Sequence, residues 1–218
     1  MSHPSTSVRV TEIFYSIQGE STFAGLPCVF VRLTGCPLRC SWCDTAYAFY
    51  GGTSLTISHI VEQVRRYNCR LVEITGGEPL HQPAAQTLIT ALCDAGFQVL
   101  VETSGAMDIA PVDTRAHIIL DVKCPASGMT HRMHWPNLAR VSQKDEIKFV
   151  IQNREDYEWA VAILHRYRLA DRCTILFSPV FGKLEHQVLA EWILQDRLPV
   201  RFQIQLHKHI WDPALPGV

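Results

Sequence analysis

The sequence has little net charge, no long apolar run and no repeats, and each absence excludes a class of protein. Its 218 residues contain 20 Lys and Arg against 21 Asp and Glu, a formal net charge of −1. Nucleic-acid-binding proteins usually have a basic excess, so we expect no nucleic-acid partner. No apolar run approaches the roughly 20 residues that span a bilayer. The polar segment Met1–Ser7 lacks the apolar core of a secretory signal. We therefore expect a cytoplasmic protein with no membrane partner.

The chain also lacks a linker. No Pro-, Gly- or Ser-rich stretch divides it, and 47% hydrophobic with 19% charged residues is an ordinary globular balance. A chain of this length forms one domain by default. We predict a single domain over residues 1–218.

Alternating strand and helix patterns define the expected fold. β-branched apolar runs predict strands at Cys28–Thr34, Leu71–Thr75, Val99–Thr103, Ile118–Val122, Ile147–Ile151, Thr174–Phe177 and Phe202–Gln205, with a further flanking strand at Val8–Ser16. Helical spacing of apolar residues predicts helices at Ser58–Tyr67, Ala84–Ala95, Asn153–Arg168 and Leu184–Gln195. Such alternation is typical of parallel βαβ units. A closed eight-fold barrel needs about 250 residues, so we predict an α/β fold with a partial, incomplete parallel β/α barrel.

Three of the eight cysteines lie within eight residues. Cys36, Cys40 and Cys43 follow a predicted strand, on a loop that also contains Gly35 and Pro37. In a reducing compartment, clustered cysteines more often bind metal or perform redox chemistry than form disulfides. The other five are isolated among apolar neighbours and are expected to be small buried hydrophobes: Cys28, Cys69, Cys93, Cys124 and Cys173.

The three clustered thiols favour an iron–sulfur cluster over zinc. Structural zinc sites use four ligands, usually two pairs separated in sequence, and no second pair is present here. A His or an isolated Cys could still complete a zinc site. Iron–sulfur clusters normally take four cysteines, so three would leave one iron open to bind a ligand.

The spacing C-x3-C-x2-C, with Trp42 before the last cysteine, resembles the signature of the radical S-adenosylmethionine (SAM) superfamily. The resemblance implies a 4Fe-4S cluster held by Cys36, Cys40 and Cys43, with SAM on the open iron. It also implies reductive cleavage of SAM to a 5′-deoxyadenosyl radical and a barrel of the radical SAM type. The cofactor carries this chemistry, and the protein positions it and excludes water.

Polar loops after successive strands are the expected SAM contacts. Thr75–Pro79 resembles the superfamily's GGEP motif, in which backbone and Glu hold the SAM amino group. The later loops follow predicted strand ends, where functional loops of barrels lie. The candidate SAM-binding residues are Gly77, Glu78, Glu102, Ser104, Asp121, Val122, Lys123, Ser178, Pro179, Val180 and Phe181.

Longer stretches are similar to the 7-carboxy-7-deazaguanine synthase family: Phe14–Ser21, Val29–Cys36, Cys43–Thr45 and Gln205–Lys208. The resemblance implies ring contraction of 6-carboxy-5,6,7,8-tetrahydropterin to 7-carboxy-7-deazaguanine with loss of ammonia, in 7-deazapurine (queuosine) biosynthesis. It further implies Mg²⁺ bound through Thr45, an electron donor such as flavodoxin or ferredoxin, and a homodimer.

The same resemblance places the substrate on Ile17, Gln18, Gly19, Arg32 and Thr75. These residue types suit a carboxylated pterin, because Arg offers a bidentate fork to a carboxylate and Gln offers neutral donors and acceptors to a ring edge.

Two features of the C-terminal half leave questions open. Asp121-Val122-Lys123 stands where family members often have Ser-Pro-Lys, although the Lys is kept. His207, Lys208 and His209 either face the site or form a solvated turn.

Two alternatives compete with this interpretation. One is a radical SAM activase that generates a glycyl radical on a partner protein, which requires an open groove for a peptide. The other is a zinc-binding interaction module without enzyme activity.

Overall fold

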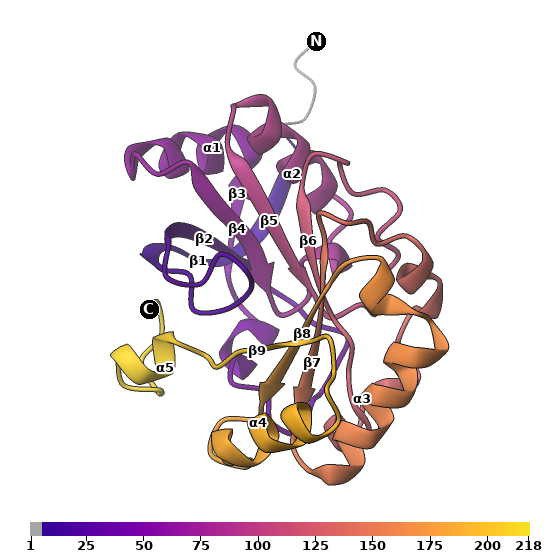
Figure 1. The fold of residues 1–218 in the computed structure, drawn as a ribbon. Coiled ribbons are helices and arrows are strands. Elements are labelled where there is room, and N and C mark those ends of the chain that lie inside the picture. The colour runs from indigo at the N-terminus through magenta and orange to yellow at the C-terminus, as the bar shows by residue number, and fades with distance from the viewer. Residues whose placement is uncertain (1–5) are drawn as a thin grey trace.

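The computed structural model describes residues 6–218, and one nine-stranded sheet organises them (Figure 1). The strand order is β3-β1-β2-β4-β5-β6-β7-β8-β9. Strands β2 and β4 to β9 are parallel, and β1 pairs antiparallel with both β2 and β3. The strands are β1 (Ser7–Ile17), β2 (Pro27–Leu33), β3 (Thr53–Thr56), β4 (Leu71–Gly76), β5 (Gln98–Thr103), β6 (His117–Asp121), β7 (Glu146–Ile151), β8 (Thr174–Pro179) and β9 (Arg201–Phe202).

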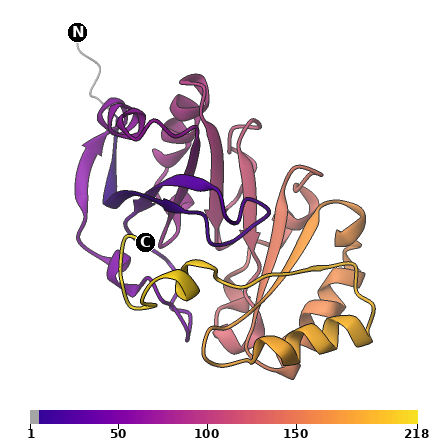
Figure 2. The same cartoon turned by 60° about the vertical axis from the view of Figure 1, so that its left-hand side comes forward.

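Helices connect the parallel strands and cover the outer face of the curved sheet (Figures 1 and 2). The α-helices are α1 (Ile57–Arg66), α2 (Ala85–Asp94), α3 (Arg154–Arg166), α4 (His186–Gln195) and α5 (His207–Ile210). Short 3-10 helices are η1 (Ala46–Phe49), η2 (Pro79–His81), η3 (Pro125–Ser127), η4 (Thr130–Arg132), η5 (Trp135–Ala139) and η6 (Leu169–Asp171). None of the helices within residues 6–218 has the length and apolar composition that a membrane crossing requires.

The fold confirms the expected α/β architecture with a partial parallel barrel. The sheet does not close, and β3 and β9 form its two edges. The single domain over 1–218 stays a prediction, and residues 1–5 lie outside the described part of the chain.

The expected strand over Phe202–Gln205 was wrong in its extent. Strand β9 contains only Arg201 and Phe202, and the chain leaves the sheet after the Gln203 backbone N–H donates to the Phe177 carbonyl of β8 at 3.0 Å. The side-chain amides of Gln203 and Gln205 both donate to Glu20, in the β1–β2 loop. These polar contacts direct the backbone away from the ladder.

Helix ends follow the capping residues expected from the sequence. The Asn153 side chain accepts a hydrogen bond from the Asp156 backbone N–H at 2.9 Å and begins α3. Gly96 follows α2 with φ of +85°, the left-handed conformation that favours glycine after a helix.

Two apolar clusters lie on opposite faces of the sheet. The larger one fills the space between the sheet and the helices. The smaller one lies on the inner face and contains Cys28, Phe30, Leu71, Leu100 and Ile119. Because side chains alternate along a strand, the next inward position on each strand lies one layer nearer the carboxyl ends.

Candidate active site

A cavity of about 530 Å³ lies on the inner face, toward the carboxyl ends of the parallel strands. Sixteen of the predicted site residues line it: Ile17, Gln18, Gly19, Arg32, Cys36, Cys40, Cys43, Thr45, Thr75, Gly77, Glu102, Ser104, Asp121, Lys123, Val180 and Phe181. Four do not: Glu78, Val122, Ser178 and Pro179. The cavity thus brings together residues expected to bind cluster, SAM and substrate.

The cysteine loop is held against the loop after β6. Ser41 donates from its backbone N–H to the Ser127 carbonyl at 3.2 Å, and from its hydroxyl to the Ala126 carbonyl at 2.8 Å. All three thiols of the loop are free and line the cavity. Burial raises the pKa of the Cys36 and Cys40 thiols, so both are protonated until a metal displaces the proton.

The glycines after β4 bring its backbone against the start of the cysteine loop. The Glu78 backbone N–H donates to the Gly35 carbonyl at 2.9 Å. A side chain at Gly77 would collide with the backbone of Gly35 and with Cys36. Only glycine fits here, so this turn fixes the position of the cysteine loop.

The Glu78 side chain is directed into the protein. Its carboxylate accepts hydrogen bonds from the Leu80 backbone N–H, the Thr103 hydroxyl, and both the backbone N–H and hydroxyl of Ser104. The side chain is fully buried. This geometry makes Glu78 an anchor between the loops after β4 and β5, and its contact with SAM stays a prediction.

Asp121 presents an unsatisfied acceptor inside the molecule. Its Oδ2 accepts from Lys123 Nζ at 2.7 Å. Its Oδ1 is buried and has no hydrogen-bond partner within residues 6–218. A buried acceptor without a donor is unfavourable, so a ligand hydroxyl or ammonium would satisfy it.

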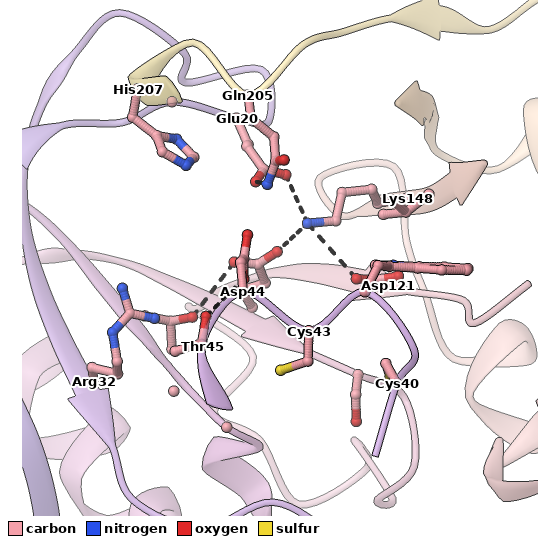
Figure 3. A pocket seen from close by; sticks show the side chains of 18 of the residues that line it. Glu20, Arg32, Cys40, Cys43, Asp44, Thr45, Asp121, Lys148, Gln205 and His207 are labelled. Carbon is pink, nitrogen blue, oxygen red and sulfur yellow. Dashed lines mark hydrogen bonds and ion pairs between the residues drawn. The ribbon is translucent and has the colours of Figure 1, made fainter. Parts of the chain in front are cut away.

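Lys148 lies at the centre of a charged layer one step above the inner apolar cluster (Figure 3). Its ammonium forms ion pairs with Glu20 at 2.8 Å, with Glu102, and with Asp121 at 3.8 Å. The side chain is 4% exposed. Burial alone would lower the pKa of Lys148, but the carboxylates of Glu102 and Glu20 outweigh it and raise the pKa. Lys148 is therefore a permanent cation shared by three carboxylates.

Gln18 and Glu73 form a second buried contact in the same layer. The Gln18 amide nitrogen donates to Glu73 Oε2, and its oxygen accepts from the Glu20 backbone N–H at 3.0 Å. Burial and the charge of Glu102 raise the pKa of Glu73. Both polar atoms of the Gln18 side chain, a predicted substrate contact, are therefore hydrogen-bonded to the protein.

Arg32 and Thr45 lie together at the other side of the cavity (Figure 3). Arg32 Nε pairs with Glu12 at 2.7 Å, and no hydrogen bond within residues 6–218 uses its Nη atoms. The Thr45 hydroxyl donates to Asp44 at 2.9 Å, so its oxygen can still accept, and Thr45 lines the cavity.

The C-terminal segment lines one side of the cavity, where Figure 3 shows Gln205 beside Glu20. The Leu206 backbone N–H donates to the Gly19 carbonyl at 2.9 Å, and Lys208 pairs with Asp44 at 2.5 Å. His207 and Lys208 line the cavity, whereas the His209 ring contacts Phe181 and is absent from the cavity lining. The basic segment therefore faces the site through two of its three members.

Comparison with known proteins identifies the family of this chain. Residues 30–188 match the sequence model of the radical SAM superfamily. The 7-carboxy-7-deazaguanine synthase of Chlorobaculum tepidum is 47% identical over 214 residues, covering 97% of each chain. That of Koribacter versatilis is 42% identical, covering 97% of this chain and all of the relative. The chain belongs to the 7-carboxy-7-deazaguanine synthase family of the radical SAM superfamily.

Solved structures share the fold of this family member. The crystal structure of QueE from Escherichia coli superposes with a TM-score of 0.76 at 22% identity, covering 92% of this chain and 95% of that one. The larger SuiB of Streptococcus suis, bound to its precursor peptide, gives 0.56 at 14% identity over 78% of this chain and 46% of that one. These two likenesses concern the fold alone.

Membership of the radical SAM superfamily brings a 4Fe-4S cluster and SAM, and the cavity fits both. Within residues 6–218, no three His, Cys, Asp or Glu side chains converge closely enough to bind a single metal ion. Each cysteine of a cubane cluster ligates a different iron, so the three sulfurs lie further apart than around zinc. Asp121, one of whose buried oxygens has no hydrogen-bond partner within residues 6–218, lines the same cavity as the three cysteines.

Sequence reasoning missed several residues that shape this site. Glu20, Glu73 and Lys148 line the cavity without having been predicted, and so does Gln205. For Glu73 and Lys148 a signal was available, because each is a charged residue between apolar neighbours in a strand of a parallel sheet. Gln205 had no such local signal, because only the path of the C-terminal segment brings it to the site.

Proposed function

We propose that this chain converts 6-carboxy-5,6,7,8-tetrahydropterin to 7-carboxy-7-deazaguanine with loss of ammonia, as a radical SAM lyase of 7-deazapurine (queuosine) biosynthesis. One observation carries the proposal. The three thiols share a single cavity with Arg32, Gln18 and Thr75, the residues expected to bind the substrate. A substrate held by the second group lies within reach of a cofactor held by the first.

The roles of the residues follow from their positions. Cys36, Cys40 and Cys43 would hold the cluster, which would supply the electron for reductive cleavage of SAM. The carboxyl-end loops of β4 to β8 would hold SAM, with Asp121 as one acceptor for a SAM hydroxyl or ammonium. The C-terminal segment lines the cavity and would limit the access of water, which protects a radical from side reactions.

Arg32 is proposed to bind the substrate carboxylate. Its Nε is engaged by Glu12, and the Phe14 and Tyr47 rings flank the guanidinium at 5.6 Å and 5.8 Å. These contacts hold the side chain still, so both Nη groups can donate in a bidentate arrangement.

Mg²⁺ is proposed to bind at Thr45. Mg²⁺ prefers oxygen ligands, keeps several waters and uses one or two protein groups together with its substrate. Thr45 offers a hydroxyl oxygen, and Asp44 lies next to it with one carboxylate oxygen on Lys208. Substrate oxygens and water complete the coordination.

An acidic electron donor such as flavodoxin or ferredoxin is proposed to dock beside the cysteine loop. Segments 36–43 and 124–135 are in contact there and contain exposed Arg39, His131 and Arg132 but no Asp or Glu. A homodimer and a cytoplasmic location stay predictions from the sequence.

The activase alternative fits the site less well. A glycyl-radical partner must insert a peptide, whereas the segment around His207 and Lys208 covers the cavity and is tied to Gly19 and Asp44. A small planar substrate suits the enclosed space better.

The decisive experiment is reconstitution under anaerobic conditions with iron, sulfide, a reductant, SAM, Mg²⁺ and 6-carboxytetrahydropterin. Mass spectrometry is expected to detect 7-carboxy-7-deazaguanine. Cys40→Ala should abolish the product and lower the iron content, while Cys93→Ala, on α2 and outside the cavity lining, should change neither. A brown protein that cleaves SAM but leaves the pterin intact would refute the proposed substrate.

A further inference from the structure

Glu73 is a buried carboxylate in the cavity that the roles proposed above do not use. It lies at the middle of β4, is 3% exposed and lines the cavity beside Thr75. Its hydrogen-bond partner within residues 6–218 is the amide of Gln18. A carboxylate offers about four acceptor sites, so most of its capacity is left for a ligand.

The contact with Gln18 orients the Glu73 carboxylate. Gln18 is itself fixed, because the Glu20 backbone N–H donates to its amide oxygen and its own backbone N–H donates to the Leu26 carbonyl. The Gln18 side chain is therefore a support, and Glu73 is the group that can present free acceptors to a substrate.

No cation neutralises Glu73 within residues 6–218. Lys148 is shared by Glu20, Glu102 and Asp121, and Arg32 is paired with Glu12. Burial and the charge of Glu102 raise the pKa of Glu73, and the hydrogen bond from Gln18 and the charge of Lys148 offset this only in part. A ligand with two parallel N–H donors would supply what the protein lacks.

The residues around Glu73 suit the binding of a flat ring. Strands β2 and β4 pair with Phe30 beside Glu73 and Arg32 beside Thr75. The Phe30 ring stacks on Phe14 with centroids 4.9 Å apart, and both rings line the cavity. Arg32 lies two residues further along its strand, roughly 6.6 Å. Arg32, which can bind a carboxylate, and Glu73, which can accept hydrogen bonds, thus lie at different positions along the stacked Phe14 and Phe30 rings.

We propose that the Glu73 carboxylate accepts hydrogen bonds from the 2-amino group and the adjacent ring N–H of the pterin, and so selects a 2-amino-4-oxo ring over a 2,4-dioxo ring. This inference rests on the proposed function and names the specificity determinant of that site. The two N–H groups of such a ring are parallel and match the two oxygens of a carboxylate. A 2-oxo group at that position faces the carboxylate with a lone pair and is repelled.

The test compares two unreactive analogues, 6-carboxypterin and 6-carboxylumazine, which differ in the 2-amino and 2-oxo groups. Their dissociation constants are measured by calorimetry on the reconstituted enzyme with SAM and Mg²⁺. The parent is expected to bind the pterin at least about tenfold more tightly, which corresponds to one lost hydrogen bond or more. In Glu73→Gln the preference should shift toward the lumazine, because the amide N–H₂ can donate to the 2-oxo group.

Two further variants separate this effect from a general loss of structure. Glu146→Gln removes another buried carboxylate, on β7 and outside the cavity lining, and should keep the parental preference. Glu73→Asp withdraws the carboxylate by one methylene and should weaken pterin binding while keeping the preference. If Glu73→Gln does not fold, the dissociation constants of the two analogues for Glu73→Asp test the proposal instead.

The outcomes distinguish the inference from the proposed function. Equal weakening of both analogues in Glu73→Gln, or an unchanged preference, refutes the role of Glu73 while turnover of 6-carboxytetrahydropterin by the parent upholds the function. A parent enzyme that neither binds 6-carboxypterin nor turns over the tetrahydropterin overturns both.

Discussion

Two successive inward-facing layers of the same strands have opposite chemistry. The lower layer contains Leu71, Leu100 and Ile119, and the upper layer, two residues further along each strand, contains Glu73, Glu102 and Asp121. Strand β7 places Glu146 in the lower layer and Lys148 in the upper one. The lower Glu146 is satisfied by protein donors and lies outside the cavity lining, while Glu73, Glu102 and Asp121 of the upper layer line the cavity. Two residues along each strand thus separate the apolar lower layer from the charged upper layer that lines the cavity.

The largest effect should come from removing the shared cation of the upper layer. Lys148→Met leaves the partly buried Glu20 and Glu102 and the buried Asp121 without their shared cation, and should cost about 3–5 kcal/mol of unfolding free energy. Urea denaturation measures this, with the exposed Arg66→Met as a control expected to change stability by less than about 0.5 kcal/mol. Full stability of Lys148→Met would mean that these carboxyls are neutral in the folded protein.

A comparable loss of stability, from a different cause, is expected in the lower layer. Leu100 is fully buried, and Leu100→Ala should cost about 2–4 kcal/mol because it leaves a cavity in the inner cluster. Its KM for the pterin should change little once the assay temperature is lowered to keep the enzyme folded. A large rise in KM while Leu100→Ala is fully folded would show that the apolar layer also shapes the substrate site.

The two layers should also differ in the pH dependence of stability. Burial alone would raise the pKa of Glu146, but hydrogen bonds from His117 and Thr22 lower it below 4.5. Its contribution is therefore present above about pH 4.5 and is lost as pH falls through the folded pKa. Glu146→Gln should be less stable than the parent by about 1–3 kcal/mol at pH 7, and the gap should shrink in acid.

Glu73 should give the opposite sign. Because its pKa is raised, ionisation opposes folding above the unfolded pKa, so the stability of Glu73→Gln relative to the parent should increase as pH rises from 4.5. Denaturation curves at several pH values measure both variants. Parallel pH profiles for Glu73→Gln and Glu146→Gln would show that the two layers are electrostatically alike.

The smallest effect is expected at the closing segment. Lys208→Met removes the pair with Asp44, whose side chain is half exposed, so the loss should be below about 1 kcal/mol. Since this pair ties the C-terminal segment over the cavity, KM for the pterin should rise by less than about fivefold. A lower kcat with unchanged KM would instead place Lys208 in the chemistry.

Local patterns made much of this structure predictable. Apolar runs located eight of the nine strands, and the spacing of Cys36, Cys40 and Cys43 predicted the cofactors that family membership brings. The short β3 carries too few apolar residues for such a pattern. Whether the predicted contacts with SAM, substrate and Mg²⁺ are made stays a prediction.

Non-local contacts account for what the sequence did not predict. Glu78 has the motif position of a ligand-binding group, yet its carboxylate accepts from Thr103 and Ser104, about 25 residues away. Gln205 reaches Glu20 across 185 residues. Such pairings depend on the curvature of the whole sheet, which no local window contains.

The close approach of Gly77 to Gly35 and Cys36 also imposes an order of events on assembly. The cysteine loop takes its shape only when β4 has docked in parallel on β2, and that docking requires the crossover through α1. The spacing of the three thiols is therefore a property of the paired strands β2 and β4 as much as of the cysteine loop itself.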